Sequence, residues 1–256
     1  MLPIICVIVA NHNYGQWVVK AVNSARIQSY DNNKIHIVVA DDGSSDDSVA
    51  KLRNSFQFLH PDSKDFPLVH DVLELDNNPE IDKRLGRGPS YARNMAIKYA
   101  EENIMPEAYI ILDADDEFLE DKVKLSVETW MEDREAIGVV YSDYYIVDQQ
   151  GNINPEYKPC FDYEMLVKNN IVHSCSLISA AAIKTCGMYD ETLRTCEDYD
   201  LWCRVGQKYV IKHIPKFLMN VRNTGLNSTF TVPSATWNSN LLEVRKRYDP
   251  SLYTQN

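Results

Sequence analysis

The stretch Ile4-Ile5-Cys6-Val7-Ile8-Val9 is followed directly by Ala10-Asn11-His12-Asn13, so an apolar, β-branched run gives way to polar side chains. Consecutive apolar residues are typical of a strand that is covered on both faces, as in a parallel sheet. Further strand candidates follow at Ile35–Ala40, Leu68–Leu75 and Tyr109–Leu112. The first half of the chain therefore predicts a buried and mostly parallel sheet.

Segments with helical spacing of apolar residues separate these runs. Gln16–Ala25 and Ser48–Phe56 each lie between two predicted strands, and Pro89–Ala100 follows Gly88, with proline in the first turn. This alternation predicts an α/β fold with a Rossmann-like, doubly wound sheet flanked by helices. The second half is more mixed, with strands at Gly138–Val147 and His173–Ser179, a turn at Asp148–Gly151 and a helix at Thr195–Tyr209.

Composition narrows the classes of protein to consider. The chain has 256 residues and a formal net charge of -11, so one core is expected and a nucleic-acid backbone would be repelled. The run Leu2–Ala10 is too short to span a bilayer and lacks the basic flank of a signal peptide. The six cysteines form no Cys-x-x-Cys pair, which favours buried thiols in a reducing compartment. We expect a cytoplasmic protein, with peripheral membrane contact and oligomeric state left open.

Acidic residues gather where the predicted strands end. Asp41 and Asp42 follow the second strand, and Asp113, Asp115 and Asp116 follow the fourth. Ligands of open α/β sheets bind beyond the carboxyl ends of the strands, so these carboxylates should share one rim. Crowded carboxylates raise one another's pKa, and a bound cation relieves that cost. Because oxygen ligands suit hard divalent ions, the rim predicts a site for Mn²⁺ or Mg²⁺.

Each acidic run also has a purely structural interpretation. The run Asp113–Asp116 could be a turn in which Asp116 and Glu117 cap a following helix. The run Asp41–Asp46 could be an Asx turn with an N-cap from its last residues, or it could offer a carboxylate to a pyrimidine imide or a ribose hydroxyl. Local spacing leaves these alternatives open.

Two further segments offer chemistry. Thr195–Asp198 fits a helix-capping pattern, and Asp198 at a helix start would be held in place, as suits a base that takes a proton from an alcohol. In Gly86–Asn94, glycines would let the backbone approach a ligand, and Arg93 could reach a carboxylate or a phosphate. On local grounds these segments could equally be a plain helix start and a glycine loop with surface arginines.

The ordered set of motifs is more specific than any one of them. Five segments, in this order and at this spacing, resemble family 2 glycosyltransferases of the GT-A fold: Val7–Tyr14, Asp41–Asp46, Ala92–Asn94, Asp113–Asp116 and Glu197–Trp202. Cys175–Leu193 is also similar to the segment that precedes the acidic pair in that family. The resemblance covers about residues 3 to 228.

The resemblance implies which residues bind the donor nucleotide. Asp42 would contact the base, usually uracil, and His12 stands where an aromatic ring often lies against that base. Ala10 and Asn13 belong to the first matching segment, and Arg87 belongs to the glycine loop beside Arg93. We expect all of them in the donor site.

The resemblance also implies a metal site and a base. Asp115 would bind the metal that bridges the diphosphate, and Asp113 would lie beside it near the donor sugar or ribose. Arg93 would brace this cluster, and Asp198 would be the catalytic base. Arg222 matches a basic position in a late loop that closes over donor and acceptor. Many relatives carry a histidine two residues further on, where this chain has Thr224.

The function that follows is inverting, metal-dependent transfer of a sugar from a nucleotide-diphospho-sugar to an acceptor hydroxyl. A UDP-sugar is the expected donor, and a carbohydrate or lipid-linked molecule the expected acceptor. One domain is expected, with residues 1–116 for the donor, 117–228 for the acceptor and catalysis, and 229–256 as a tail. The alternatives are a nucleotidyltransferase of related fold and a non-catalytic carbohydrate- or nucleotide-binding protein. Sugar rings could stack on four tyrosines, which could also be core or surface aromatics: Tyr144, Tyr145, Tyr157 and Tyr163.

Overall fold

A computed structural model describes residues 1–57, 68–75, 86–227 and 231–252. The N-terminal half builds a parallel sheet from β1 (Ile5–Asn11), β2 (Ile35–Asp41), β3 (Leu68–Glu74) and β4 (Ala108–Asp113). These strands lie in the order β3-β2-β1-β4, and every neighbouring pair is parallel. All four predicted strands are present, and the prediction of a mostly parallel sheet in this half is confirmed.

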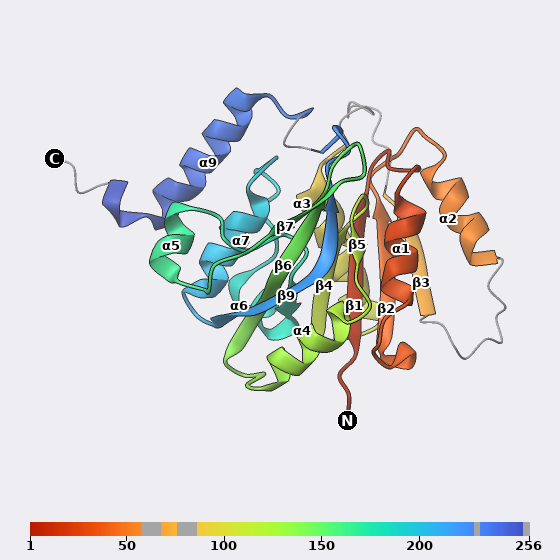
Figure 1. The fold of residues 1–256 in the computed structure, drawn as a ribbon, viewed down its shortest axis with the longest axis horizontal. Coiled ribbons are helices and arrows are strands. Elements are labelled where there is room, and N and C mark those ends of the chain that lie inside the picture. The colour runs from red at the N-terminus through yellow and green to blue at the C-terminus, as the bar shows by residue number, and fades with distance from the viewer. Residues whose placement is uncertain (58–67, 76–85, 228–230, 253–256) are drawn as a thin grey trace.

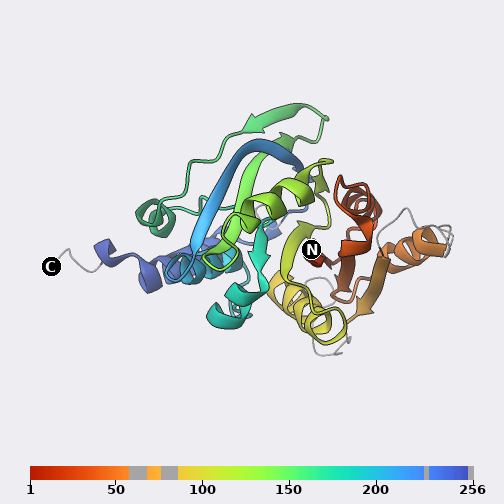
Figure 2. The ribbon, with the colours of Figure 1, turned by 90° about the horizontal axis from the view of Figure 1, so that it is seen from below.

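Helices cover both faces of this parallel half. The three are α1 (Val18–Arg26), α2 (Ser48–Gln57) and α3 (Pro89–Asn103). Alternate residues of β1 point to opposite faces, as the two-residue period of a strand requires. Cys6 and Ile8 pack in the core beneath α3, whereas Ile5, Val7 and Val9 pack in the core beneath α1. Figure 2 shows α3 on one side of the sheet and α1 on the other.

The second half extends the same sheet in a mixed manner. Its strands are β5 (Glu117–Phe118), β6 (Ile137–Val147), β7 (Ile153–Glu156), β8 (Leu177–Ser179) and β9 (Val210–Arg222). The order continues as β4-β8-β6-β9-β5, in which only the β6–β9 pair is parallel, and β7 pairs with β6. The expected mixed second half is therefore confirmed, and it is continuous with the first.

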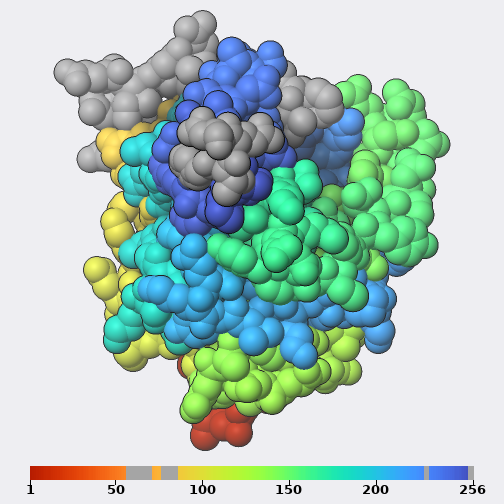
Figure 3. Space-filling model, turned by 90° about the vertical axis from the view of Figure 1, so that its left-hand side faces the viewer, coloured from red at the N-terminus to blue at the C-terminus, as the bar shows by residue number. Residues whose placement is uncertain are grey.

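The remaining helices surround this mixed half. They are α4 (Lys122–Met131), α5 (Tyr163–Lys168), α6 (Ala180–Cys186), α7 (Glu197–Gly206) and α9 (Ser234–Tyr248), with 3-10 turns at Asn32–Lys34 and Pro250–Leu252. Helix α9 packs against α5 and α7, as Figures 1 and 3 show. Among the described helices, none has both the length and the apolar character needed to cross a membrane.

Two predicted elements in this half are shorter than expected. Of the predicted strand His173–Ser179, only Leu177–Ser179 form β8. Ser176 O still accepts from Ile111 N–H of β4 at 3.3 Å, whereas Ser176 N–H donates to Ser174 O in a local turn. The predicted helix Thr195–Tyr209 begins only at Glu197. The capping pattern at Thr195 is not formed, because the N-cap is Cys196, in a left-handed conformation with φ of 62° and no side-chain cap.

The cysteines agree with the expected free thiols. All six are free, and four are buried: Cys6, Cys175, Cys196 and Cys203. Buried thiols of this kind behave as small apolar side chains.

Candidate active site

The acidic segment after β4 forms a tight turn at the rim of the sheet. Asp113 ends β4, and its carbonyl accepts a hydrogen bond from Asp116 N–H at 3.0 Å. Glu117 begins the short strand β5, so the predicted helix cap by Asp116 and Glu117 is not formed, and the next helix, α4, starts at Lys122. The turn interpretation is thus right in part, and it presents three carboxylates at the predicted rim.

A buried arginine lies beneath this turn. Arg93 Nη2 is 2.7 Å from Asp113 Oδ1, and Arg93 Nη1 is 2.7 Å from Glu197 Oε1. The residue is 3% exposed, and although burial opposes its charge, Asp113 and Glu197 raise the pKa of Arg93 above its usual value. Burial alone would raise the pKa of Asp113, but Arg93 brings it below the usual value. Helix α3 thereby joins β4 to the start of α7 through one ion network.

The ionised forms of the other two carboxylates of the turn, Asp115 and Asp116, are disfavoured. Burial and the charge of Asp113 raise the pKa of Asp115 to about 7. Burial, with Asp115 and Asp113, also raises the pKa of Asp116 well above its usual value. Asp115 Oδ2 accepts a hydrogen bond from Asn227 Nδ2 at 2.8 Å, and Asp116 Oδ1 accepts one from Arg222 N–H at 2.9 Å. A cation at this turn would offset the repulsion.

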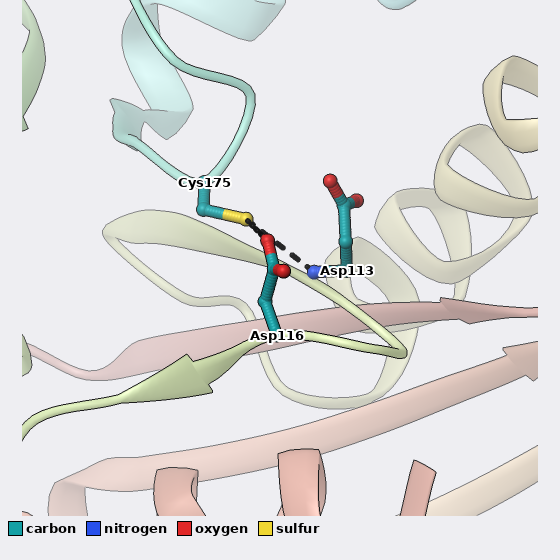
Figure 4. Close-up of side chains that lie close together, drawn as sticks. All are labelled: Asp113, Asp116 and Cys175. Atoms are coloured by element: carbon teal, nitrogen blue, oxygen red, sulfur yellow. Dashed lines mark hydrogen bonds between the residues drawn. The ribbon is translucent and has the colours of Figure 1, made fainter. Parts of the chain in front are cut away.

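Cys175 lies against the same turn. Its Sγ is 3.5 Å from Asp116 Oδ2 and accepts a hydrogen bond from Asp113 N–H at 3.4 Å, as Figure 4 shows. Ligand atoms of Asp113, Asp116 and Cys175 lie within 4.8 Å of one another, whereas the sequence predicts Asp113 and Asp115 as the metal ligands. Burial raises the pKa of Cys175 well above its usual value, so the sulfur stays protonated. A protonated thiol is a poor ligand for hard ions.

Exposure distinguishes the carboxylates as candidate ligands. Asp116 is 2% exposed, and its two oxygens are held by Arg222 and Cys175. The Asp113 side chain is 28% exposed, which leaves it accessible to a ligand at the rim. Oxygen donors with a shared negative charge fit Mn²⁺ or Mg²⁺, so the residues at this turn are compatible with the expected metal. Asp113 and Asp115 are the pair that the sequence predicts; in the structure, Arg93 and Ser174 bond the two Asp113 oxygens, and Asp115 is 6% exposed.

The three aspartates Asp41, Asp42 and Asp46, which end or follow β2, make different contacts. Asp41 accepts hydrogen bonds from Asn11 Nδ2 at 2.6 Å and from Ser44 N–H at 2.8 Å, so it holds the turn. Asp46 accepts from Ser48 N–H at 3.0 Å, at the start of α2. Asp42 instead points to the glycine loop, and its Oδ2 accepts from Gly88 N–H at 2.7 Å. Burial raises the pKa of Asp42, and the bond from Gly88 partly offsets this.

His12 and Asn13, which follow β1, hydrogen-bond the loop after β2. His12 Nδ1 is 2.8 Å from the Asp42 carbonyl, which can only accept, so Nδ1 carries the proton. Asn13 has φ of 61°, and its Oδ1 accepts from Ser45 N–H at 2.7 Å and from Asp46 N–H at 3.2 Å. The Asn13 side chain therefore connects the loop after β1 to the loop after β2.

Three other predicted donor-site residues lie around the rim. Ala10 stands in register with Asp113 on the neighbouring strand. The Arg87 guanidinium lies 4.4 Å from the centre of the Tyr91 ring, beside the glycine loop. The Arg222 guanidinium pairs with Glu117 and lies 5.0 Å from the centre of the Trp17 ring, so the backbone rather than the side chain of Arg222 contacts the acidic turn.

Asp198 is the second residue of α7. Its Oδ1 accepts from Tyr199 N–H at 2.7 Å, and its Oδ2 accepts from Asn170 Nδ2 at 3.1 Å. Burial raises the pKa of Asp198, and Arg93 opposes this shift. Since the adjacent Glu197 is bound to Arg93, the candidate base is tied to the acidic turn through Glu197, Arg93 and Asp113.

Several residues of this site were not expected from the sequence. Ser174 Oγ donates to Asp113 Oδ2 at 2.8 Å, and the ring of His173 lies 4.6 Å from that of Tyr144. Lys158 Nζ lies 5.8 Å from the centre of the Tyr144 ring. In the sequence, the only signal for His173 and Ser174 is that two polar residues interrupt an apolar run. Tyr144 and Lys158 have no such signal, because their positions depend on how β6, β7 and β8 are arranged.

The four tyrosines that could stack on sugar rings have different surroundings. The Tyr144 ring contacts the His173 ring, next to Ser174 of the site. The Tyr145 ring stacks on Phe217 with ring centres 4.4 Å apart. Tyr157 meets Phe217 edge-on and is 70% exposed. Tyr163 hydrogen-bonds Cys203 O at 3.4 Å and packs against the core, which fits the structural alternative.

Comparison with solved structures places this fold in a class. S. aureus TarS 1-349 in complex with UDP matches with a TM-score of 0.65 at 18% identity, over 97% of this chain and 73% of that one. The mannosyltransferase PcManGT from Pyrobaculum calidifontis, in complex with GDP-Man and Mn2+, matches with a TM-score of 0.66 at 17% identity, over 95% and 63%. The chain thus has the GT-A fold of glycosyltransferases.

The amino-acid sequence defines the family within that class. The family model for Glycosyl transferase family 2 matches residues 6–187, and the chain belongs to this family. An uncharacterized glycosyltransferase from Rickettsia felis is 26% identical over 235 residues, which cover 90% of this chain and 35% of that protein. The chain spans about a third of the length of the first curated relatives it matches. The family resemblance seen in the motifs is confirmed.

Proposed function

We propose that this chain transfers a sugar from a nucleotide-diphospho-sugar to an acceptor hydroxyl, with a divalent cation and with inversion of the anomeric carbon. One observation carries the proposal: Arg93 joins Asp113, on the acidic turn, to Glu197, the neighbour of Asp198. Arg93 thereby connects the acidic turn, which would bind the cation, to the start of α7, where Asp198 would remove the proton. Residues 1–116 would serve the donor, and 117–228 the acceptor and catalysis.

The donor side rests on Asp42 and the acidic turn. Asp42 is held at the rim by Gly88 N–H, and in this position a carboxylate can accept the imide N–H of uracil. A cation bound by Asp115 and Asp113 would stabilise the charge that builds on the leaving diphosphate. The neighbours named above were solved with UDP and with GDP-Man and Mn2+, which supports a nucleoside diphosphate of this kind. We favour UDP because of Asp42.

The chemical step rests on Asp198. Asn170 and Tyr199 N–H orient its carboxylate, and burial raises its pKa, so it is a stronger base than an exposed aspartate. Asp198 would take the proton from the acceptor hydroxyl as that oxygen attacks the anomeric carbon. The bond to the diphosphate breaks on the opposite face, so the product has the inverted configuration. No carboxylate has to act as a nucleophile in a single displacement.

A nucleotidyltransferase is the main enzymatic alternative. Such an enzyme would want a glycine-rich phosphate loop after β1, with backbone N–H groups directed at the ligand. Here the loop has one glycine, Gly15, and its N–H donates to Asp46 Oδ2 at 2.8 Å. This loop favours sugar transfer over nucleotidyl transfer. A non-catalytic binding protein would need no base at Asp198, and the Asp198→Asn variant distinguishes that alternative.

The test is product formation with a panel of UDP-, dTDP- and GDP-sugars and simple glycoside acceptors, in Mn²⁺ or in EDTA. We expect transfer from a UDP-sugar that needs the cation, with an inverted anomeric proton by NMR. Retained configuration would rule out the single displacement, and equal transfer in EDTA would rule out the cation. UDP binding without transfer to any acceptor by the wild type, and with no change in Asp198→Asn, would favour the binding protein.

A further inference from the structure

The segment that follows β9 folds back onto the acidic turn. Asn227 Nδ2 donates to Asp115 Oδ2 at 2.8 Å and to Arg222 O at 2.9 Å. Asn227 Oδ1 accepts from Thr224 N–H at 2.9 Å. One side-chain amide therefore closes the loop 222–227 on itself and fixes it to a carboxylate that is 112 positions away in the sequence.

A second contact holds this loop over the rim. Tyr14 Oη, from the segment after β1, donates to Leu226 O at 3.1 Å. Thr224 Oγ1 also approaches Asp115 Oδ2, but at 3.5 Å it is a much weaker partner than the amide. Of the described side chains, Asn227 thus makes the shortest hydrogen bond to Asp115.

We propose that Asn227 is a positioning residue for the cation site: it orients the Asp115 carboxylate through the hydrogen bond from its side-chain amide. The inference rests on the proposed function, because it assumes that Asp115 binds the cation. Both of these side-chain donors to Asp115, the Asn227 amide and the Thr224 hydroxyl, approach its Oδ2 atom. Outer hydrogen bonds of this kind fix the direction of a ligating carboxylate.

The burial of Asp115 agrees with this role. Asp115 is 6% exposed and lies in the acidic turn between Asp113 and Asp116, so few side chains can set its direction. An amide N–H donor stabilises the ionised form, which is the form that a metal binds. Losing such an outer partner typically costs about 10-fold to 100-fold in metal affinity.

The experiment measures Mn²⁺ binding directly, by the loss of the free-ion EPR signal, with UDP present at saturation. Asn227→Ala removes the amide, and Asn227→Leu removes the donor while keeping the volume. Asn223→Ala is the matched control, since Asn223 lies in the same loop and its Oδ1 accepts from Gly225 N–H at 3.3 Å. Thermal unfolding in EDTA checks that all variants fold alike.

We expect both Asn227 variants to bind Mn²⁺ about 10-fold to 100-fold more weakly, with Asn223→Ala unchanged. UDP binding measured in EDTA should be the same in all four proteins. Unchanged or tighter Mn²⁺ binding in the Asn227 variants would overturn the inference alone, because the amide would then be irrelevant to the ion or compete with it. No Mn²⁺ binding by the wild type would overturn the proposed cation site as well.

Discussion

At the scale of single residues, Asp198 offers the sharpest test of catalysis. Asparagine keeps its size and can still accept from Tyr199 N–H, so the start of α7 should persist. It cannot take a proton, and general bases contribute about 10²-fold to 10⁴-fold in rate. We expect Asp198→Asn to lose turnover by that factor and to bind UDP normally by calorimetry. Asp162→Asn, at the cap of α5, is the control that should retain full activity. Normal turnover in Asp198→Asn would reduce Asp198 to a structural residue.

The raised pKa of Asp115 should make cation binding depend on pH. Burial and Asp113 raise its pKa to about 7, so below that pH the carboxyl is protonated and a cation must displace the proton. Apparent Mn²⁺ affinity should therefore fall by about tenfold per pH unit below about 7 and level off above it. Calorimetry at pH 5.5 to 8 measures this slope. Affinity that is independent of pH across this range would show that Asp115 does not titrate with the ion.

Among the secondary-structure elements, α3, β4 and α7 are connected by the two ion pairs of Arg93, and we expect these pairs to stabilise the fold. Arg93→Leu leaves the buried Glu197 and the partly exposed Asp113 without their shared partner, which should cost about 3–5 kcal/mol in free energy of unfolding. Urea denaturation measures the loss. Arg134→Leu is the control, because its pair with Glu107 is exposed on both sides and such pairs contribute about 0–1 kcal/mol. Equal losses in both variants would contradict the buried network.

The glycine loop makes a separate prediction about the base site. A Cβ at Gly86 would lie 2.4 Å from Asp42 Oδ2, and φ there is +57°. Gly86→Ala should displace the carboxylate and weaken UDP binding by about 1.5–3 kcal/mol, as the loss of a charged hydrogen bond does. Gly151→Ala carries a similar backbone strain, with φ of +85° and nothing within 4 Å of the new Cβ, and should leave UDP affinity intact. Unchanged affinity in Gly86→Ala would remove Asp42 from the base site.

At the scale of the whole molecule, ligand binding should appear as added stability. The rim draws residues from both halves of one continuous sheet, so UDP with Mn²⁺ should stabilise the entire fold. Ligand at 100 times its Kd adds about 2.7 kcal/mol. We expect thermal unfolding to shift upward with UDP and Mn²⁺, much less with UDP in EDTA, and less with ADP and Mn²⁺. Shifts of equal size in Mn²⁺ and in EDTA would contradict a shared cation site.

The first half of the fold could be predicted because its signals are local. The strands β1, β2 and β4 are nearly continuous apolar runs, and Gly88-Pro89 marks the start of α3. The strand β9 has no such signal, since Pro215 lies within Val210–Arg222 and the register with β6 shifts just there, between Ser142 and Asp143. A proline interrupts the ladder and is tolerated only at an edge or a bulge. The structure around it depends on partners distant in sequence.

The acidic residues of the rim and the strand ends that carry them could be predicted from local patterns. Asp42, Asp113 and Asp115 follow apolar runs, and parallel strands bring such ends to one rim. The partners of these carboxylates are defined only in the folded chain. Arg93 contacts Glu197 across 104 positions, and Asn227 contacts Asp115 across 112, so no local pattern could encode either contact. Burial and charge depend on neighbours in space, and folding brings those neighbours together from distant parts of the sequence.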